Sequence, residues 1–104
     1  MSTADNEYLS VSLILMQGSP EAQATVDLLE RSHSDLVIDD HETFWKITAP
    51  GGHLEVDMQA LSEELGMEIS LPQWLVIMSS YVGRVQTEPG KLTLTSDVTQ
   101  IHRN

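Results

Sequence analysis

The stretch from residue 51 to residue 95 constrains the fold most, because strand, helix and turn signals follow one another there almost without a gap. It begins with His53–Val56, where apolar and polar residues alternate as in a half-buried strand. Asp57 then offers a favourable N-cap for a helix, and Gly66 is the residue type that most often ends one. These residues predict a short strand that leads directly into a short helix.

A second, more apolar helix is predicted after Gly66. Ser70 and Gln73 have the spacing of a capping box, which marks a helix start. The apolar residues that follow recur at helical spacing, at Leu71, Leu75, Met78 and Val82. We therefore expect one helix that begins after Ser70 and carries this stripe. The run Trp74–Met78 also fits a buried strand, since periodicity does not decide over so short a run, but the capping box favours the helix.

Short strands and one further helix account for the rest of the chain. Ser19 and Pro20 begin a helix that ends near Arg31 and Ser32. The predicted strands are residues 8–16, 36–38, 44–48, 53–56, 84–87 and 91–95, the last two forming a hairpin around Glu88-Pro89-Gly90. The order is β-α-β-β, then β-α-α-β-β. The predicted fold class is α+β: a single small domain of two β-α-β-β-like halves, with short helices packed on a mostly antiparallel sheet.

The patterned part of the chain runs from residue 8 to residue 96, which we predict to be one folded domain. Residues 1–7 are small and polar and are expected to form a disordered N-terminal tail. Residues 97–104 are expected to form a C-terminal tail.

The charge of the chain limits its partners. Its 16 acidic and 5 basic residues give a net charge of −11, which repels nucleic acid and anionic lipid. Proteins with basic patches, or neutral small molecules, fit better. There is no cysteine, so disulfides and thiol chemistry are excluded. No secretory signal and no long apolar run is visible, so we expect no membrane span and a cytoplasmic location.

Two groups of residues have a spacing or composition that catalysis or metal binding could use. Glu30-x-x-His33 is the spacing by which a helix supplies two ligands to a di-iron site, but such a site needs a second motif and further glutamates. The acidic cluster Asp39–Glu42, with His41, lies on a predicted turn, where adjacent side chains converge poorly. His53 and His102 have no partner at ligand spacing. Because the common phosphate-binding, hydrolase and zinc motifs are missing too, we predict no catalytic residue, no metal site and no cofactor.

The apolar helix is the unusual feature of the sequence. Leu71, Leu75 and Met78 are explained by one core-facing side. Trp74, Ile77 and Tyr81 exceed what one face of a helix in a small domain can bury. A surplus of this kind indicates a surface that docks against a larger partner.

An ordered series of short segments between Leu36 and Leu94 resembles a known family. The segments are Phe44–Ile47, His53–Asp57, Leu61–Gly66, Ser79–Arg84 and Lys91–Ser96. The series is similar to the effector (regulatory, coupling) proteins of soluble di-iron monooxygenases, and Val11–Leu29 matches the first strand and helix of that family. The resemblance rests on the order of the segments and not on one signature.

The resemblance implies a non-catalytic protein that has no cofactor. In this family the effector binds the hydroxylase component above its di-iron centre, and tunes substrate access, oxygen activation and the coupling of electron delivery to hydroxylation. The segment that matches Ser79–Tyr81 faces the hydroxylase near the active-site entrance. The predicted partner-binding residues are therefore Trp74, Ile77, Ser79, Ser80, Tyr81, Gly83 and Arg84. The free protein is expected to be a monomer or a weak homodimer.

Two differences from the methane-type members bear on the substrate. Those members carry a small hydroxyl residue where this chain has Tyr81, and they have a long N-terminal tail that is not matched here. Both differences favour the effectors of propane, alkene, cyclic ether, toluene or phenol monooxygenases.

Two other functions stay open on the sequence. One is a small-molecule-sensing domain of ferredoxin-like plan, which dimerises through its sheet and binds a ligand beside the apolar helix. The other is a small cofactorless enzyme that uses His41 or His53 as a base. A di-iron hydroxylase gene beside this one would favour the effector.

Overall fold

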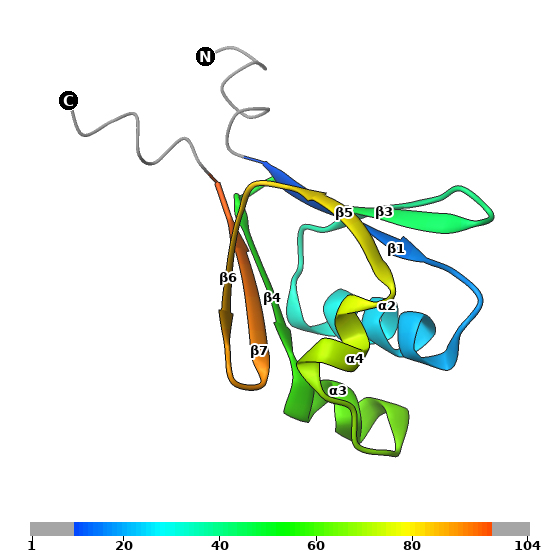
Figure 1. Cartoon of the computed structure of the whole chain (residues 1–104). Helices are drawn as coiled ribbons and strands as arrows, with labels where there is room; N and C mark the ends of the chain where they lie inside the picture. The colour runs from blue at the N-terminus through cyan, green and yellow to red at the C-terminus, as the bar shows by residue number, and fades with distance from the viewer. Residues whose placement is uncertain (1–9, 97–104) are drawn as a thin grey trace, which may run out of the picture.

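The structure, a computed structural model, describes residues 10–96, which form two antiparallel sheets and three helices (Figure 1). The predicted tails at residues 1–7 and 97–104 lie outside the described residues. The elements are β1 (Val11–Met16), α2 (Pro20–Ser32), β2 (Val37–Asp40), β3 (Phe44–Ala49), β4 (His53–Asp57), α3 (Met58–Leu65), α4 (Leu71–Leu75), β5 (Met78–Val82), β6 (Arg84–Glu88) and β7 (Lys91–Thr95). The α+β class predicted from the sequence is confirmed. No helix among these residues is long and apolar enough to cross a bilayer.

The first sheet has four strands and the second has three. The first has the strand order β2-β3-β1-β5 and the second the order β4-β7-β6. In Figure 1 the helices lie together on one side of the first sheet, and the second sheet closes the molecule on the left. The predicted halves therefore do not correspond to the sheets, because β5 belongs to the second half of the chain but pairs with β1.

Local signals set the helix ends as the sequence predicts. The Ser19 hydroxyl accepts a hydrogen bond of 3.1 Å from the Ala22 amide at the start of α2. Asp57 caps α3 by accepting 2.9 Å from the Gln59 amide, and Gly66 ends α3 at a φ of 84°. These caps occupy backbone groups that the helix itself leaves unpaired.

The core lies between the two sheets and the helices. β1 buries Val11, Leu13 and Leu15 on one face, as the alternation predicts. The other buried hydrophobic side chains come from both sheets, all three helices and the connection between α3 and α4: Ala22, Ala24, Val26, Leu29, Ile47, Ala49, Leu54, Val56, Met58, Leu61, Ile69, Trp74, Leu92 and Leu94. Ser12, which lies between Val11 and Leu13 on the opposite face of the strand, is buried as well.

The second predicted helix is much shorter than expected, and its second part is a strand. α4 ends at Leu75, and the Ile77 amide closes the last turn on the carbonyl of Trp74 at 3.0 Å. Residues 78–82 then form β5, in which Ser80 pairs with Ile14 and Val82 with Ser12. This pairing satisfies the backbone of β1 on the side that β3 does not occupy. Pairing of residues 78–82 with β1 is therefore favoured over continuation of the helix, although the apolar residues recur at helical spacing.

The predicted polar turn also begins later than expected. Asp39 and Asp40 are the last residues of β2, opposite Lys46 and Trp45 of β3. The Asp40 carboxylate accepts 2.8 Å from the Glu42 amide, which holds the tight turn in which Glu42 has a φ of 74°. These contacts, the amide of Glu42 first and Gln17 second, lower the pKa of Asp40.

Gly83 is the point where the chain leaves the first sheet and enters the second. Its φ is 132°, which L side chains rarely adopt. A β-carbon there would lie 2.9 Å from the carbonyl oxygen of Thr95 and 2.9 Å from a methyl group of Val11. Gly83 was predicted to contact a partner, and the structure gives it a structural reason to be glycine.

We expect Gly83→Ala to lower the free energy of unfolding by about 3 kcal/mol or more, because strain and overlap act together. The matched control is Gly90→Ala, where φ is 83° but nothing lies within 4 Å of the added carbon. Strain alone should cost the control about 1–2 kcal/mol. Urea unfolding followed by circular dichroism compares the two, and equal losses would contradict the close approach at Gly83.

Candidate functional site

Trp74 fixes the short helix α4 to α2 from inside the core. Its indole Nε1–H donates a hydrogen bond of 2.9 Å to the hydroxyl oxygen of Thr25. That hydroxyl donates in turn to the carbonyl of Glu21 at 2.7 Å. Trp74 is fully buried, so the expectation that its ring belongs to an exposed apolar surplus is wrong. Trp74, together with the half-buried Leu71, attaches the short helix α4 to the core.

The strand that follows, β5, lies at the edge of the first sheet and contains a bulge. Ile14 pairs with Ser80 but Leu15 pairs with Met78, so Ser79 is the extra residue on β5. A bulge of this kind changes the direction of side chains and increases the local twist. It returns Met78 to the side that packs against the core, while Ser79, Ser80, Tyr81 and Val82 are all exposed.

The structure brings together only some of the predicted partner-binding residues. Ser79, Ser80 and Tyr81 lie side by side on β5 and are exposed, and Arg84 is exposed at the start of β6. Ile77 is half-buried and packs against the core. Trp74 is in the core and Gly83 lies in the bend. Whether any of the seven contacts a partner stays a prediction.

Exposed apolar side chains gather around this segment. Of the seven large hydrophobic side chains that are exposed among residues 10–96, four lie within residues 75–82. They are Leu75, Val76, Tyr81 and Val82, and Val76 is 81% exposed. Met16, also exposed, is next to them, since its amide donates to the carbonyl of Ile77 at 2.9 Å. We call Met16, Leu75, Val76 and Ser79–Val82 the α4–β5 surface.

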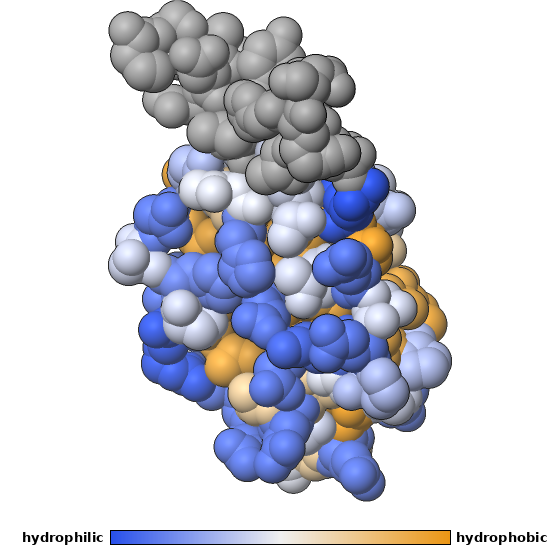
Figure 2. Space-filling model, turned by 90° about the vertical axis from the view of Figure 1, so that its left-hand side faces the viewer, coloured by the Kyte–Doolittle hydropathy of each residue, from blue (hydrophilic) through white to orange (hydrophobic). Residues whose placement is uncertain are grey.

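Sequence reasoning identified Tyr81 but missed the other apolar members of this surface. A continuous helix would have turned Leu75 and Val82 towards the core, and it gave Val76 no role. The β-branched residues Val76 and Ile77, and the two serines that follow Met78, are poor helix formers and were the available signal for an early helix end. Unlike the α4–β5 surface, the side of the molecule on which the second sheet lies is largely hydrophilic. Apolar side chains gather at the right-hand edge of this view (Figure 2).

A hollow of about 460 Å³ lies between α2, α3 and β4. It is lined by Leu28, Ser32, His33, His53, Glu55, Asp57 and Ala60. Glu55 is held by Lys91, whose Nζ donates 2.8 Å to its carboxylate, and this bond lowers the pKa of Glu55. In the described part of the chain no group of three or more metal-ligating side chains is placed to hold an ion.

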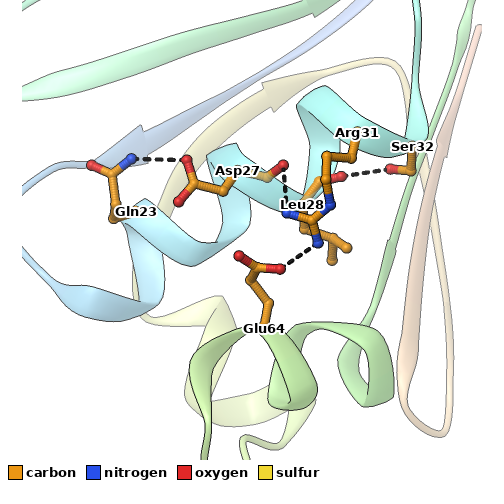
Figure 3. A network of polar contacts seen from close by, with 6 residues as sticks. All are labelled: Gln23, Asp27, Leu28, Arg31, Ser32 and Glu64. Atoms are coloured by element: carbon orange, nitrogen blue, oxygen red, sulfur yellow. Dashed lines mark hydrogen bonds and ion pairs between the residues drawn. The ribbon is translucent and has the colours of Figure 1, made fainter.

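The end of α2 that carries the Glu30-x-x-His33 motif takes part in helix packing. The Arg31 guanidinium contacts the Glu64 carboxylate of α3 and also reaches the carbonyl of Asp27 (Figure 3). The hydrogen bond from Arg31 lowers the pKa of Glu64. The Ser32 hydroxyl lies 3.1 Å from Nδ1 of His33. These contacts join α2 to α3 and do not assemble a reactive group.

A profile of the MmoB/DmpM family matches residues 10–95. The chain belongs to the MmoB/DmpM family. Among curated members, methane monooxygenase regulatory protein B of Methylosinus trichosporium is 32% identical over 103 residues, covering 94% of this chain and 73% of that protein. The protein of the same name from Methylococcus capsulatus (strain ATCC 33009 / NCIMB 11132 / Bath) is 36% identical over 66 residues, covering 64% of this chain and 46% of its own length.

Solved structures place the MmoB/DmpM fold over most of the described residues. A chain in the structure of a phenol hydroxylase–regulatory protein complex superposes with a TM-score of 0.75 at 15% identity, covering 85% of this chain and 99% of that chain. The structure of the soluble methane monooxygenase regulatory protein B gives a TM-score of 0.66 at 26% identity, covering 90% and 70%. The family match and the curated relatives confirm the effector family predicted from the ordered segments, and the solved structures agree with its fold.

We expect Thr25→Val to lower the free energy of unfolding by about 1–3 kcal/mol, because it leaves the buried indole N–H of Trp74 without its acceptor. Thr87→Val on the exposed strand β6 is the control and should change stability by less than about 0.5 kcal/mol. The measurement is urea unfolding at equilibrium. A Thr25→Val variant as stable as the control would show that the bond does not hold α4 in place.

Proposed function

We propose that this chain is the non-catalytic regulatory component of a multicomponent di-iron monooxygenase, and that it acts by binding the hydroxylase component. Membership of the MmoB/DmpM family and the names of the similar methane monooxygenase proteins support this role. The observation on this chain that carries it is the α4–β5 surface, where exposed apolar side chains are concentrated. The protein is expected to work in the cytoplasm beside its enzyme.

The composition of the α4–β5 surface suits a contact with a large protein. Val76, Tyr81 and Val82 offer apolar area that docking would remove from water. Ser79 and Ser80 are small, so a partner's backbone can approach closely between the larger side chains. Arg84, at the start of β6, can form a bidentate pair with a partner carboxylate. None of these groups needs to react, since binding alone can shift a hydroxylase between two states.

The acidic surface of the rest of the molecule is suited to long-range attraction of a partner more than to direct contact with it. A net charge of −11 creates a field that reaches beyond the binding surface and favours partners with basic patches. Charges at the edge of an interface change mainly the association rate. We therefore assign specific contact to the α4–β5 surface and attraction to the acidic body.

The topology of the first sheet is also compatible with the alternative function, a ferredoxin-like sensor. The succession β1-α2-β2-β3 and then α4-β5, with the order β2-β3-β1-β5, follows a β-α-β-β-α-β plan into which β4 and α3 are inserted. Family membership favours the regulatory role over the sensor.

We expect Val76→Ser to weaken binding to the hydroxylase by about 1–3 kcal/mol, because a central apolar contact is lost. Stability should hardly change, since Val76 is 81% exposed. Met67→Ser is the matched control: Met67 is 63% exposed but lies between α3 and α4, outside the α4–β5 surface. Both variants are titrated against the purified hydroxylase by calorimetry. Equal losses of affinity in the two variants, or none in either, would contradict the assignment.

Tyr81 is proposed to shape the route by which substrate reaches the hydroxylase. It is 46% exposed and lies on the edge strand β5, where it pairs with Leu13 of β1. Tyr81→Thr should shift the substrate-size preference of the reconstituted enzyme, whereas Tyr81→Phe keeps the ring and should not. The readout is the relative rate of product formation over a series of hydrocarbons of increasing size. A Tyr81→Thr profile identical to wild type, with binding intact, would remove Tyr81 from this role.

A further inference from the structure

One face of the first sheet is not covered by the helices. The helices lie together on the other side of this sheet (Figure 1), where Leu13, Leu15 and Ile47 are buried. Side chains alternate between the two faces along a strand, and residues that pair across an antiparallel sheet share a face. The register therefore places the intervening residues of β1 and β3, and their partners on β2 and β5, on the opposite face. We call this face, with Ile14, Met16, Val37, Phe44, Lys46 and Val82, the outer face.

The outer face is more apolar than the solvent-facing side of an antiparallel sheet usually is. Such a sheet commonly packs one face on the core and presents polar side chains on the other. Here Met16, Val37 and Val82 are 43%, 48% and 64% exposed, and Ile14 and Phe44 are half-buried. A concentration of exposed apolar side chains on one face indicates an interaction surface.

Lys46 lies near the middle of the outer face. It is exposed, and its register partners are Asp39 of β2 and Ile14 of β1. Arg31 and Lys91 each contact a carboxylate, whereas Lys46 forms no ion pair with any of the described residues. Burying an ammonium group without a partner is costly. A protein that covers this face therefore has to supply a carboxylate.

We propose that the outer face is a second part of the contact with the hydroxylase, and that a hydroxylase carboxylate pairs there with Lys46. The inference rests on the proposed function and adds a contact to it. Met16 and Val82 belong both to the outer face and to the α4–β5 surface, so the two surfaces are continuous. The α4–β5 surface alone is much smaller than the about 20–30 residues that each protein contributes to a stable interface. A hydroxylase that covers β5 therefore continues over β1 and β3.

The pair at Lys46 selects the orientation of the complex. The apolar side chains around it attract any apolar surface, because the hydrophobic effect has no direction. The ammonium group accepts only a surface that brings a carboxylate to one point, and every other arrangement leaves it buried and unpaired. Charge complementarity of this kind fixes the register of an interface and suppresses wrong partners.

Two variants with the same change of net charge test the pair. Lys46→Gln should raise the dissociation constant for the purified hydroxylase about tenfold, mainly through faster dissociation. Gln86→Glu on the exposed strand β6 is the matched control and should stay within about twofold of wild type, since it lies outside both surfaces. Val37→Ser, on the strand farthest from β5, should raise the constant about threefold. Surface plasmon resonance gives the rates, and circular dichroism checks that each variant is folded.

Labelling of lysines shows directly whether the outer face is covered. The sequence contains two lysines, Lys46 and Lys91, and Lys91 on β7 serves as the internal reference. An N-hydroxysuccinimide ester labels both amines, and mass spectrometry reads the two rates separately. We expect the hydroxylase to slow the labelling of Lys46 and to leave that of Lys91 unchanged.

The proposal is overturned if Lys46→Gln and Gln86→Glu bind equally well, or if Lys46 is labelled as fast in the complex as in the free protein. It is also overturned if concentrating the protein alone slows the labelling of Lys46, because the occupant is then a second copy. If Val76→Ser weakens binding while Lys46 stays accessible in the complex, the outer-face contact fails and the proposed function stands. If wild type does not bind the hydroxylase, the proposed function fails, and the outer-face contact with it.

Discussion

The buried hydrogen bond between Trp74 and Thr25 is the contact on which the candidate site depends. α4 is a single short turn, and helices of that length are not stable on their own. The indole ring holds the turn against α2, and the Thr25 hydroxyl gives its N–H the one partner it needs in the core. The position of Trp74 therefore fixes where the following residues start. Val76 is exposed to solvent, and β5 begins beside β1.

β5 is held along one edge and open along the other. β1 satisfies its inner backbone groups, the bulge at Ser79 sets the direction of its side chains, and Gly83 fixes where it ends. A surface carried by a strand that is fixed at both ends is placed more accurately than one carried by a loop. The exposed apolar side chains can therefore remain in water without the segment folding back on itself, because the core around Trp74, Leu13 and Leu94 is already filled.

Local signals allowed the sequence to predict the helix starts at Ser19, Asp57 and Ser70 and the end at Gly66, since each cap involves neighbouring residues. The strand β5 could not be predicted in this way. Its formation depends on β1, which is distant in the sequence, and the helical spacing from Leu71 to Val82 is misleading without that neighbour. The same error placed Trp74 at the surface and hid Val76 and Val82. The exposed positions of Ser79–Tyr81 agree with the family resemblance, but their contact with a hydroxylase stays a prediction.

Direct contact with a partner and long-range attraction of that partner are assigned to different surfaces by the distribution of charge. Burying a carboxylate in an interface carries a desolvation cost that a partner must offset with a well-placed cation. The edges β2 and β4 carry such carboxylates, whereas β5 carries none, so contact through β5 avoids that cost. The acidic groups remain in water, where they act over distance and keep the other edges apart. The absence of charge on β5 therefore suits this strand to direct contact with a large protein partner.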